Sequence, residues 1–319
     1  MNRHRHAGQK SLRHKKPFTV HAGQTGAALL VFFVLLFSAA AAVALSALNN
    51  RVAGRTSDQT VFSELAQAKE ALLSFALLYP DYYSGGPGRL PCPDTNNNGL
   101  TDSGCTNATI GQLPNAIASS PFVFSSRIPG ERFWYAITGQ YRGSPVIADL
   151  NADSSGAFTI NGQSNIVAVI IDAGPPVGTQ ARSGSSANVI NYLEGGNQTS
   201  PDFFTSSATP ALFNDRVAFI SSAEIRTQMT VRVAQEIKRV LDIYHPLNLN
   251  TYPIDETAFD LAMSGPGVAG WYGTDDWESA LENYTLVSAN SATFKFNNCT
   301  TTFTITFGQP GLQRSTGSC

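Results

Sequence analysis

A long run of apolar residues near the amino end is the strongest pattern in this chain of 319 residues. Residues 27–48 contain no charged side chain, and 22 residues at about 1.5 Å each form a helix of about 33 Å, enough to cross a bilayer core of about 30 Å. The pattern therefore predicts a membrane-spanning helix. A cleavable signal peptide is the alternative, because Ala39–Ala42 are the small residues typical of its cleavage site.

Two amphipathic helices are predicted further along the chain. After a polar break over 49–60, apolar residues recur at spacings of four and three until Pro80. The second helix opens at Ser221, which has capping-box spacing to Glu224, and should end at Pro246. The expected buried positions are Val61, Leu65, Ala68, Leu72 and Ala76 in the first helix and Ile225, Met229, Val233, Ile237, Leu241 and Tyr244 in the second. Both helices share Ala, Glu and Pro at equal spacing, so an internal repeat is an alternative to two unrelated helices.

Short strands are predicted between and after these helices. Turns rich in Asn, Asp and Gly separate candidate strands at 133–138, 145–150, 156–160 and 165–172. The last of these is apolar on both faces and should be central, whereas residues 184–204 have the composition of a long exposed connection. Phe and Thr alternate towards residue 307, which indicates a half-buried antiparallel sheet. The predicted fold is α+β: a membrane helix continuing into a helix on an antiparallel sheet, then a smaller helix-and-sheet unit.

The distribution of charge orients the chain in a membrane. Residues 1–26 hold six Lys or Arg, four of the five His and no acid, so this end should stay in the cytoplasm. The rest carries 15 Lys or Arg against 23 Asp or Glu, a formal charge of 15 minus 23, or −8, which argues against nucleic acid as a partner. Charged residues make up 14% of the chain, against about 25% in most soluble domains, which suits an extracytoplasmic surface.

The junction between the basic leader and the apolar run is Gly26 followed by Ala27. It resembles the class III prepilin leader of type IV pilins and type II secretion pseudopilins. In that family a membrane peptidase cuts after the glycine, and the apolar helix remains as both anchor and filament core. The sequence departs from the family at Val31, because the fifth mature position is usually Glu. This variation is similar to that of the large K-type minor pseudopilins and X-type minor pilins, and implies a place at a filament tip or in priming.

The resemblance implies a structural subunit of a pilus or secretion filament. Such a subunit would lie in the bacterial inner membrane with its amino end cytoplasmic and its carboxyl-terminal part periplasmic. Its partners would be other pilins or pseudopilins and the prepilin peptidase. The expected organisation is a leader (1–26), a transmembrane and assembly helix (27–48), a pilin-like α+β domain (49–215) and a second helix-and-sheet subdomain (216–319). The alternative is a single-pass periplasmic binding or adhesive protein that never enters a filament.

The four cysteines fall into two pairs that are local in sequence, Cys92 with Cys105 and Cys299 with Cys319. Local pairs in a translocated chain usually form disulfides, although four cysteines allow three pairings. A bond to the last residue would hold the tail and contribute roughly 3 kcal/mol on a loop-entropy estimate.

The loop after Cys92 is a candidate calcium site. Its acidic and amide side chains alternate and are followed by Gly99, as at the start of an EF-hand loop. The ligands would be Asp94, Asn96, Asn98, the Leu100 carbonyl and Asp102. Cys105 stands where an EF-hand has its bidentate Glu, so such a site would be weak. The alternative is an ion-free loop of Asx turns.

Residue types that favour catalysis are sparse. His245 is the only histidine outside the leader, and the chain has no GxSxG, HExxH, Walker or dinucleotide motif. Carboxylate catalysis stays open, but the sequence favours a protein that is not an enzyme. A second acidic turn, residues 149–156, should be a hairpin turn, and Trp271 and Trp277 should pack on the second helix.

Overall fold

The computed structural model describes residues 58–117, 121–125, 127, 131–143, 149–182, 188–205 and 212–319. The leader, the apolar run and most of the predicted strand at 145–150 lie outside the described residues.

Helix α1 is described over residues 58–82, and its apolar stripe is buried as predicted. The most buried predicted positions, at most 2% exposed, are Leu65, Ala68, Leu72 and Ala76. The helix continues two residues past Pro80, so the predicted end at this proline is wrong. Proline has no N–H for the carbonyl of Ala76, and this carbonyl instead accepts a hydrogen bond from Gly88 N at 2.8 Å. The helix therefore tolerates proline in its last turn.

The first sheet is centred on strand β4. Its strands are β1 (Ile110–Gln112), β2 (Trp134–Ile137), β3 (Phe158–Ile160), β4 (Gln163–Asp172), β5 (Asp202–Phe203) and β6 (Arg216–Ser221). Strand β4 pairs with β6 along one edge and with β3 and then β2 along the other. Residues 166–172 are all buried, which confirms the predicted central strand. The sheet is mixed rather than wholly antiparallel, because β5 pairs parallel with β3.

The connection after β4 covers one face of this sheet, so the prediction that residues 184–204 are exposed is wrong for the residues described. Leu193 and Phe203 are fully buried, and the ring of Tyr192 lies 5.2 Å from that of Trp134 on β2. The apolar stripe of α1 packs with the residues of the opposite face. A strand that is apolar on both faces needs cover on both, and this connection provides the second cover. It contains the short 3-10 helices η2 (Val189–Asn191) and η3 (Gly195–Gln198); a further one, η1 (Gly139–Tyr141), follows β2.

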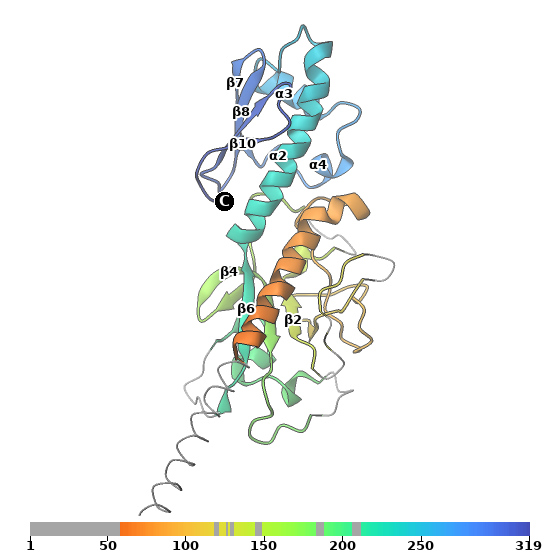
Figure 1. Cartoon of the computed structure of the whole chain (residues 1–319), viewed down its shortest axis with the longest axis vertical. Coiled ribbons are helices and arrows are strands. Elements are labelled where there is room, and N and C mark those ends of the chain that lie inside the picture. The colour runs from red at the N-terminus through yellow and green to blue at the C-terminus, as the bar shows by residue number, and fades with distance from the viewer. Residues whose placement is uncertain are drawn as a thin grey trace, which may run out of the picture. The chain divides into compact units, whose positions relative to one another are not determined.

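Helix α2 (Ser222–Leu247) starts directly where β6 ends and reaches the second sheet (Figure 1). The Ser221 hydroxyl accepts a hydrogen bond from Glu224 N at 3.2 Å, which confirms the predicted cap. Helices α1 and α2 lie side by side in the same direction, and two ion pairs join them, Lys69 to Glu224 (2.7 Å) and Arg232 to Asp81 (2.5 Å). The second helix ends at Leu247, one residue beyond the predicted Pro246.

The second sheet is antiparallel and has the order β10-β9-β8-β7. Its strands are β7 (Leu281–Ser288), β8 (Ser291–Phe296), β9 (Thr302–Thr306) and β10 (Gln313–Arg314), and the helices α3 (Glu256–Met263) and α4 (Gly270–Thr274) precede it. Phe294, Phe303 and Ile305 are at most 1% exposed, which confirms the alternation read from the sequence.

Residues Thr60–Cys319 belong to one compact unit. One hydrophobic cluster contains Leu72 of α1, Met229 of α2 and Phe303 of β9, so the two sheets share a core through the helices. The predicted boundary after residue 215 falls directly before β6, a strand that completes the first sheet.

Candidate functional site

Disulfides close both local cysteine pairs, Cys92–Cys105 and Cys299–Cys319. Of the three pairings that the sequence leaves open, the structure has the sequence-local one. The first disulfide closes the loop that was predicted to hold calcium.

Asp94, the first predicted calcium ligand, is fully buried, and other groups already bind its carboxylate. Its Oδ2 lies 2.6 Å from Arg132 Nη1 and accepts a hydrogen bond from Gly99 N at 2.7 Å. Its Oδ1 accepts a hydrogen bond from Asn98 N at 3.2 Å. The Arg132 guanidinium therefore neutralises the carboxylate that was predicted as the first calcium ligand.

The other predicted ligands form local turns. The Asn96 side chain accepts a hydrogen bond from Asn98 N at 3.1 Å, and the Asn98 side chain accepts one from Leu100 N at 2.8 Å. Asp102 accepts a hydrogen bond from Thr95 N at 3.1 Å. Among the described residues, no three His, Cys, Asp or Glu side chains gather in a metal-binding arrangement. The contacts fit the ion-free alternative, and calcium binding stays a prediction for experiment.

The second acidic turn makes contacts with a distant part of the chain. Asn151 Nδ2 donates to the Asp275 carbonyl at 3.1 Å, and the Asp153 carboxylate accepts from the amides of Asn297 (3.0 Å) and Asn298 (2.9 Å). These partners are 124 to 145 residues away in sequence. A hairpin turn was the expectation, and no sequence pattern pointed to this long-range role.

A buried ion pair also joins the neighbourhood of Asp275 to a distant part of the chain. Arg89 Nη2 lies 2.5 Å from Asp275 Oδ1, and Gly86 N donates to Asp275 Oδ2 at 2.8 Å. Burial raises the pKa of Asp275, because loss of solvation outweighs the attraction of Arg89. A Cβ on Gly86 would lie 2.2 Å from Asp275 Oδ2, so this approach needs glycine. No sequence pattern identified the pairing of Arg89 with Asp275, which are 186 residues apart.

Trp271 and Trp277, the tryptophans on either side of Asp275 in the sequence, pack within the protein rather than forming an exposed loop. Trp277 is fully buried, and its ring lies 5.6 Å from that of Phe296 on β8. Trp271 is partly buried against the main hydrophobic cluster. The ring contact of Trp277 is therefore with the second sheet, and packing of both tryptophans on α2 stays a prediction.

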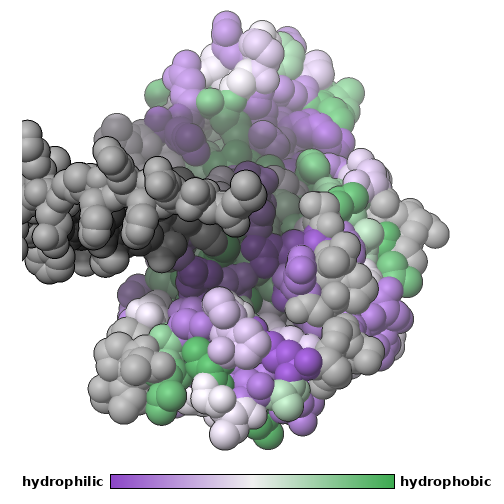
Figure 2. Space-filling view, turned by 60° about the horizontal axis from the view of Figure 1, so that its bottom comes forward, coloured by the Kyte–Doolittle hydropathy of each residue, from purple (hydrophilic) through white to green (hydrophobic). Residues whose placement is uncertain are grey.

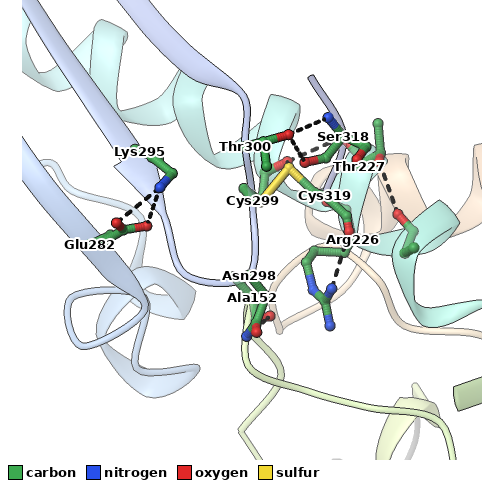
Figure 3. The surroundings of a disulfide bond; sticks show 12 residues. Ala152, Arg226, Thr227, Glu282, Lys295, Asn298, Cys299, Thr300, Ser318 and Cys319 are labelled. Atoms are coloured by element: carbon green, nitrogen blue, oxygen red, sulfur yellow. Dashed lines mark hydrogen bonds and ion pairs between the residues drawn. A yellow bond between two sulfur atoms is a disulfide. The ribbon is translucent and has the colours of Figure 1, made fainter. Parts of the chain in front are cut away.

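The carboxyl end is fixed around the second disulfide (Figure 3). Thr300 N donates to the Ser318 carbonyl at 2.8 Å, and Ser318 N donates to Thr300 Oγ1 at 3.0 Å. Arg226 Nη1 of α2 donates to the Cys319 carbonyl at 3.1 Å. Cys319 and Ser318 are therefore held both by the connection between β8 and β9 and by α2.

Glu194 and Asp215 form a buried carboxyl pair beside the first sheet. Glu194 N donates to Asp215 Oδ2 at 3.0 Å, and Asp215 N donates to Glu194 Oε2 at 3.1 Å. Burial raises the pKa of Asp215 to about 8, the nearby Glu194 carboxyl also raises it, and the Asn197 amide at 2.9 Å opposes the rise. Burial and the neighbouring carboxyl therefore favour the protonated form of Asp215. No motif in the sequence identifies this pair.

His245 lies within packed side chains. Its Nε2 is 2.7 Å from Asn290 Oδ1, and its ring stacks on Phe307 with centroids 3.9 Å apart. The side chain is 2% exposed, so it does not line an open cleft.

The surface shown in Figure 2 mixes hydrophilic and hydrophobic residues. None of the helices in the described ranges has both the length and the apolar character that a bilayer crossing requires. Gly26 and Ala27, the predicted processing site, lie outside those ranges. Comparison with known protein families, curated proteins and solved structures finds no match to the chain.

Proposed function

We propose that the chain is a membrane-anchored minor pilin-like or pseudopilin-like subunit of a type IV pilus or type II secretion filament, and that it acts by assembly rather than by catalysis. The order of features along the chain carries the proposal. A basic leader ends at Gly26, an uncharged run of 22 residues follows, and α1 then packs its apolar stripe on a sheet. The apolar run would anchor the chain in the inner membrane and then pack among the equivalent helices of other subunits.

The contacts of α1 support this role, because a filament subunit needs its head fixed to its stem. Leu72 is fully buried in the core, and Lys69 and Asp81 each make an ion pair with α2. Movement of α1 would therefore carry both the first sheet and α2 with it.

Val31 supports a terminal position in the filament. In the family that the leader resembles, Glu at this place neutralises the amino terminus of a neighbouring subunit. Valine offers no carboxylate, so this subunit suits the tip or the priming complex.

Processing by a prepilin peptidase tests the proposal. We expect coexpression with such a peptidase to shorten the chain to a product that begins at Ala27, and Gly26→Ala to block the cleavage. Gly23→Ala is the matched control, because it changes a glycine three residues earlier in the same leader and should leave cleavage unchanged. A native product that begins after Ala42 would identify a signal peptide and refute the proposal.

A single-pass periplasmic binding or adhesive protein is the competing function. The uncharged run and the disulfides suit that protein equally well. Fractionation separates the two: recovery of the mature chain with sheared filaments favours assembly, and recovery only as a membrane monomer favours the simple anchor.

A further inference from the structure

The connection that covers the first sheet is fastened to the segment before β6 by the carboxyl pair of Glu194 and Asp215. Each of the two residues donates its backbone N–H to the carboxyl of the other, at 3.0 and 3.1 Å. Asn197 of η3 donates to the same Asp215 oxygen that Glu194 N reaches. Glu194 is 6% exposed and Asp215 4%, so water has little access to these bonds.

The arrangement of the two carboxyls requires a proton. Their side chains hydrogen-bond to each other, and an ionised carboxylate can only accept, so one of the two must carry a hydrogen. Asp215 Oδ1 accepts no hydrogen bond from an N–H or O–H group of the described residues, so this oxygen can hold the proton. Removal of the proton would leave two negative charges in contact in a buried place, where solvent screens their repulsion poorly.

The charged groups around the pair do not offset a second negative charge. Residues 173–215 contain one cation, Arg182, whose Nη2 lies 3.9 Å from Glu194 Oε1 and donates to backbone carbonyls instead. Arg216 at the start of β6 pairs with Asp172 at 2.9 Å, and Asp202 of β5 is an exposed acid. A groove of about 340 Å³ lies beside Glu194, and its other described lining residues are uncharged.

The surface beneath the connection is apolar. Tyr192 and Leu193 pack in one hydrophobic cluster with Trp134 of β2 and with Val169 and Ile171 of β4. The ladder between the connection and the sheet is short, because β5 has two residues. The carboxyl pair is therefore a main fastening of a layer that would otherwise leave these side chains in water.

We propose that the Glu194–Asp215 pair is a pH-sensitive latch, which holds the connection of residues 188–205 on the first sheet while it keeps its proton and lets the connection open when the proton leaves. Opening would present the apolar face around Trp134 at higher pH and hide it in acid, with the rest of the fold intact. Burial raises the pKa of Asp215 from 3.8 to about 8, so the opening should increase between these two values. The latch would operate whether or not the chain enters a filament.

Hydrogen–deuterium exchange tests the latch on the full chain in nanodiscs, followed by mass spectrometry from about pH 5 to about pH 9 and corrected for the intrinsic pH dependence of amide exchange. We expect the protection of residues 189–198 to fall by up to about tenfold per pH unit and to level off above about pH 8, because opening releases one proton. Protection of β8 should stay constant, since this strand lies in the second sheet.

Variants assign the response to the pair. Asp215→Asn should keep residues 189–198 protected throughout the pH range, because an amide can make the same hydrogen bonds without a titrating proton. Asp202→Asn is the matched control, since it removes an exposed carboxylate from the same connection and should leave the native response unchanged. Native protection that does not vary with pH, or an equal response in Asp215→Asn, would overturn the proposal. Loss of protection in β8 together with the connection would indicate unfolding of the whole chain and would also overturn it.

Discussion

The guanidinium of Arg89 lies 2.5 Å from the carboxylate of Asp275, and the two side chains are 0% and 3% exposed. The pair joins the loop after α1 to the end of α4, 186 residues further along the chain. Asn151 donates to the carbonyl of the same Asp275. These polar groups hold the carboxyl-terminal part of the chain against the first sheet.

Loss of one partner of this pair should be costly. We expect Arg89→Met to lower the free energy of unfolding by about 3–5 kcal/mol, because it leaves the Asp275 charge buried without its counterion. Lys295→Met is the control, since its pair with Glu282 is exposed and should contribute about 0–1 kcal/mol. Urea unfolding of both variants measures the difference. Similar losses of unfolding free energy would show that the buried pair stabilises the fold no more than the exposed pair does.

Calcium should have little effect on the native chain. Arg132 already neutralises Asp94, so we expect the melting temperature to stay the same with millimolar calcium or with a chelator. Magnesium serves as the control for general salt effects. A clear rise with calcium alone would support the site that the sequence pattern indicates, and would require Arg132 to move away from Asp94.

The contribution of Asp215 to stability should fall as the pH rises from about 4 to about 8. The folded pKa of Asp215, about 8, lies above its ordinary value of 3.8, so the folded chain holds a proton that the unfolded chain releases between these values. The slope can reach about 1.4 kcal/mol per pH unit for one proton. Asp215→Asn should flatten the dependence of the unfolding free energy on pH over this range. Asp202→Asn changes an exposed carboxylate instead, and an equal flattening there would contradict the assignment.

The disulfide at the carboxyl end should contribute measurably to stability. Replacing both Cys299 and Cys319 by Ser should lower the free energy of unfolding by about 3 kcal/mol, because the open chain gains the entropy of a loop that spans 20 residues. Denaturant unfolding of the double variant measures the loss. An unchanged midpoint would mean that the hydrogen bonds of Thr300 and Ser318 hold the tail alone.

The proposed terminal position in a filament should depend on Val31. We expect immunogold label for the native chain at filament ends, and label along the shaft for Val31→Glu, which introduces the carboxylate usual in the family that the leader resembles. Val34→Glu places the same charge three residues later and is the matched control. Label spread evenly along the shaft in the native chain would contradict the proposed position.

The elements that the sequence predicts well are those whose side chains repeat regularly. The Phe and Thr alternation over β8 and β9 and the Ser221 cap of α2 follow from local rules, and both are confirmed. The central strand β4 is recognisable because both its faces are apolar. A strand that is apolar on both faces needs a layer of residues packed on each face. Composition alone does not show that Leu193 and Phe203 belong to the second layer.

The errors arise where a distant partner supplies what the local sequence lacks. Pro80 fails to end α1 because Gly88 supplies the hydrogen bond that proline cannot. Calcium binding in the loop after Cys92 stays a prediction, but the contact of Arg132 with Asp94, 38 residues apart in sequence, could not be read from the sequence. The link from Asn151 to Asp275 likewise depends on tertiary contact, which one sequence does not reveal.

Helix α2 follows β6 without an intervening loop, and its 26 residues, about 39 Å long, reach the second sheet without a break. A hinge motion between the two sheets would have to bend α2 and also separate Arg89 from Asp275. Tension applied to the second sheet should therefore be transmitted along α2 to β6 and to its hydrogen bonds with β4. Residues 60–319 should then respond to the force as one rigid unit.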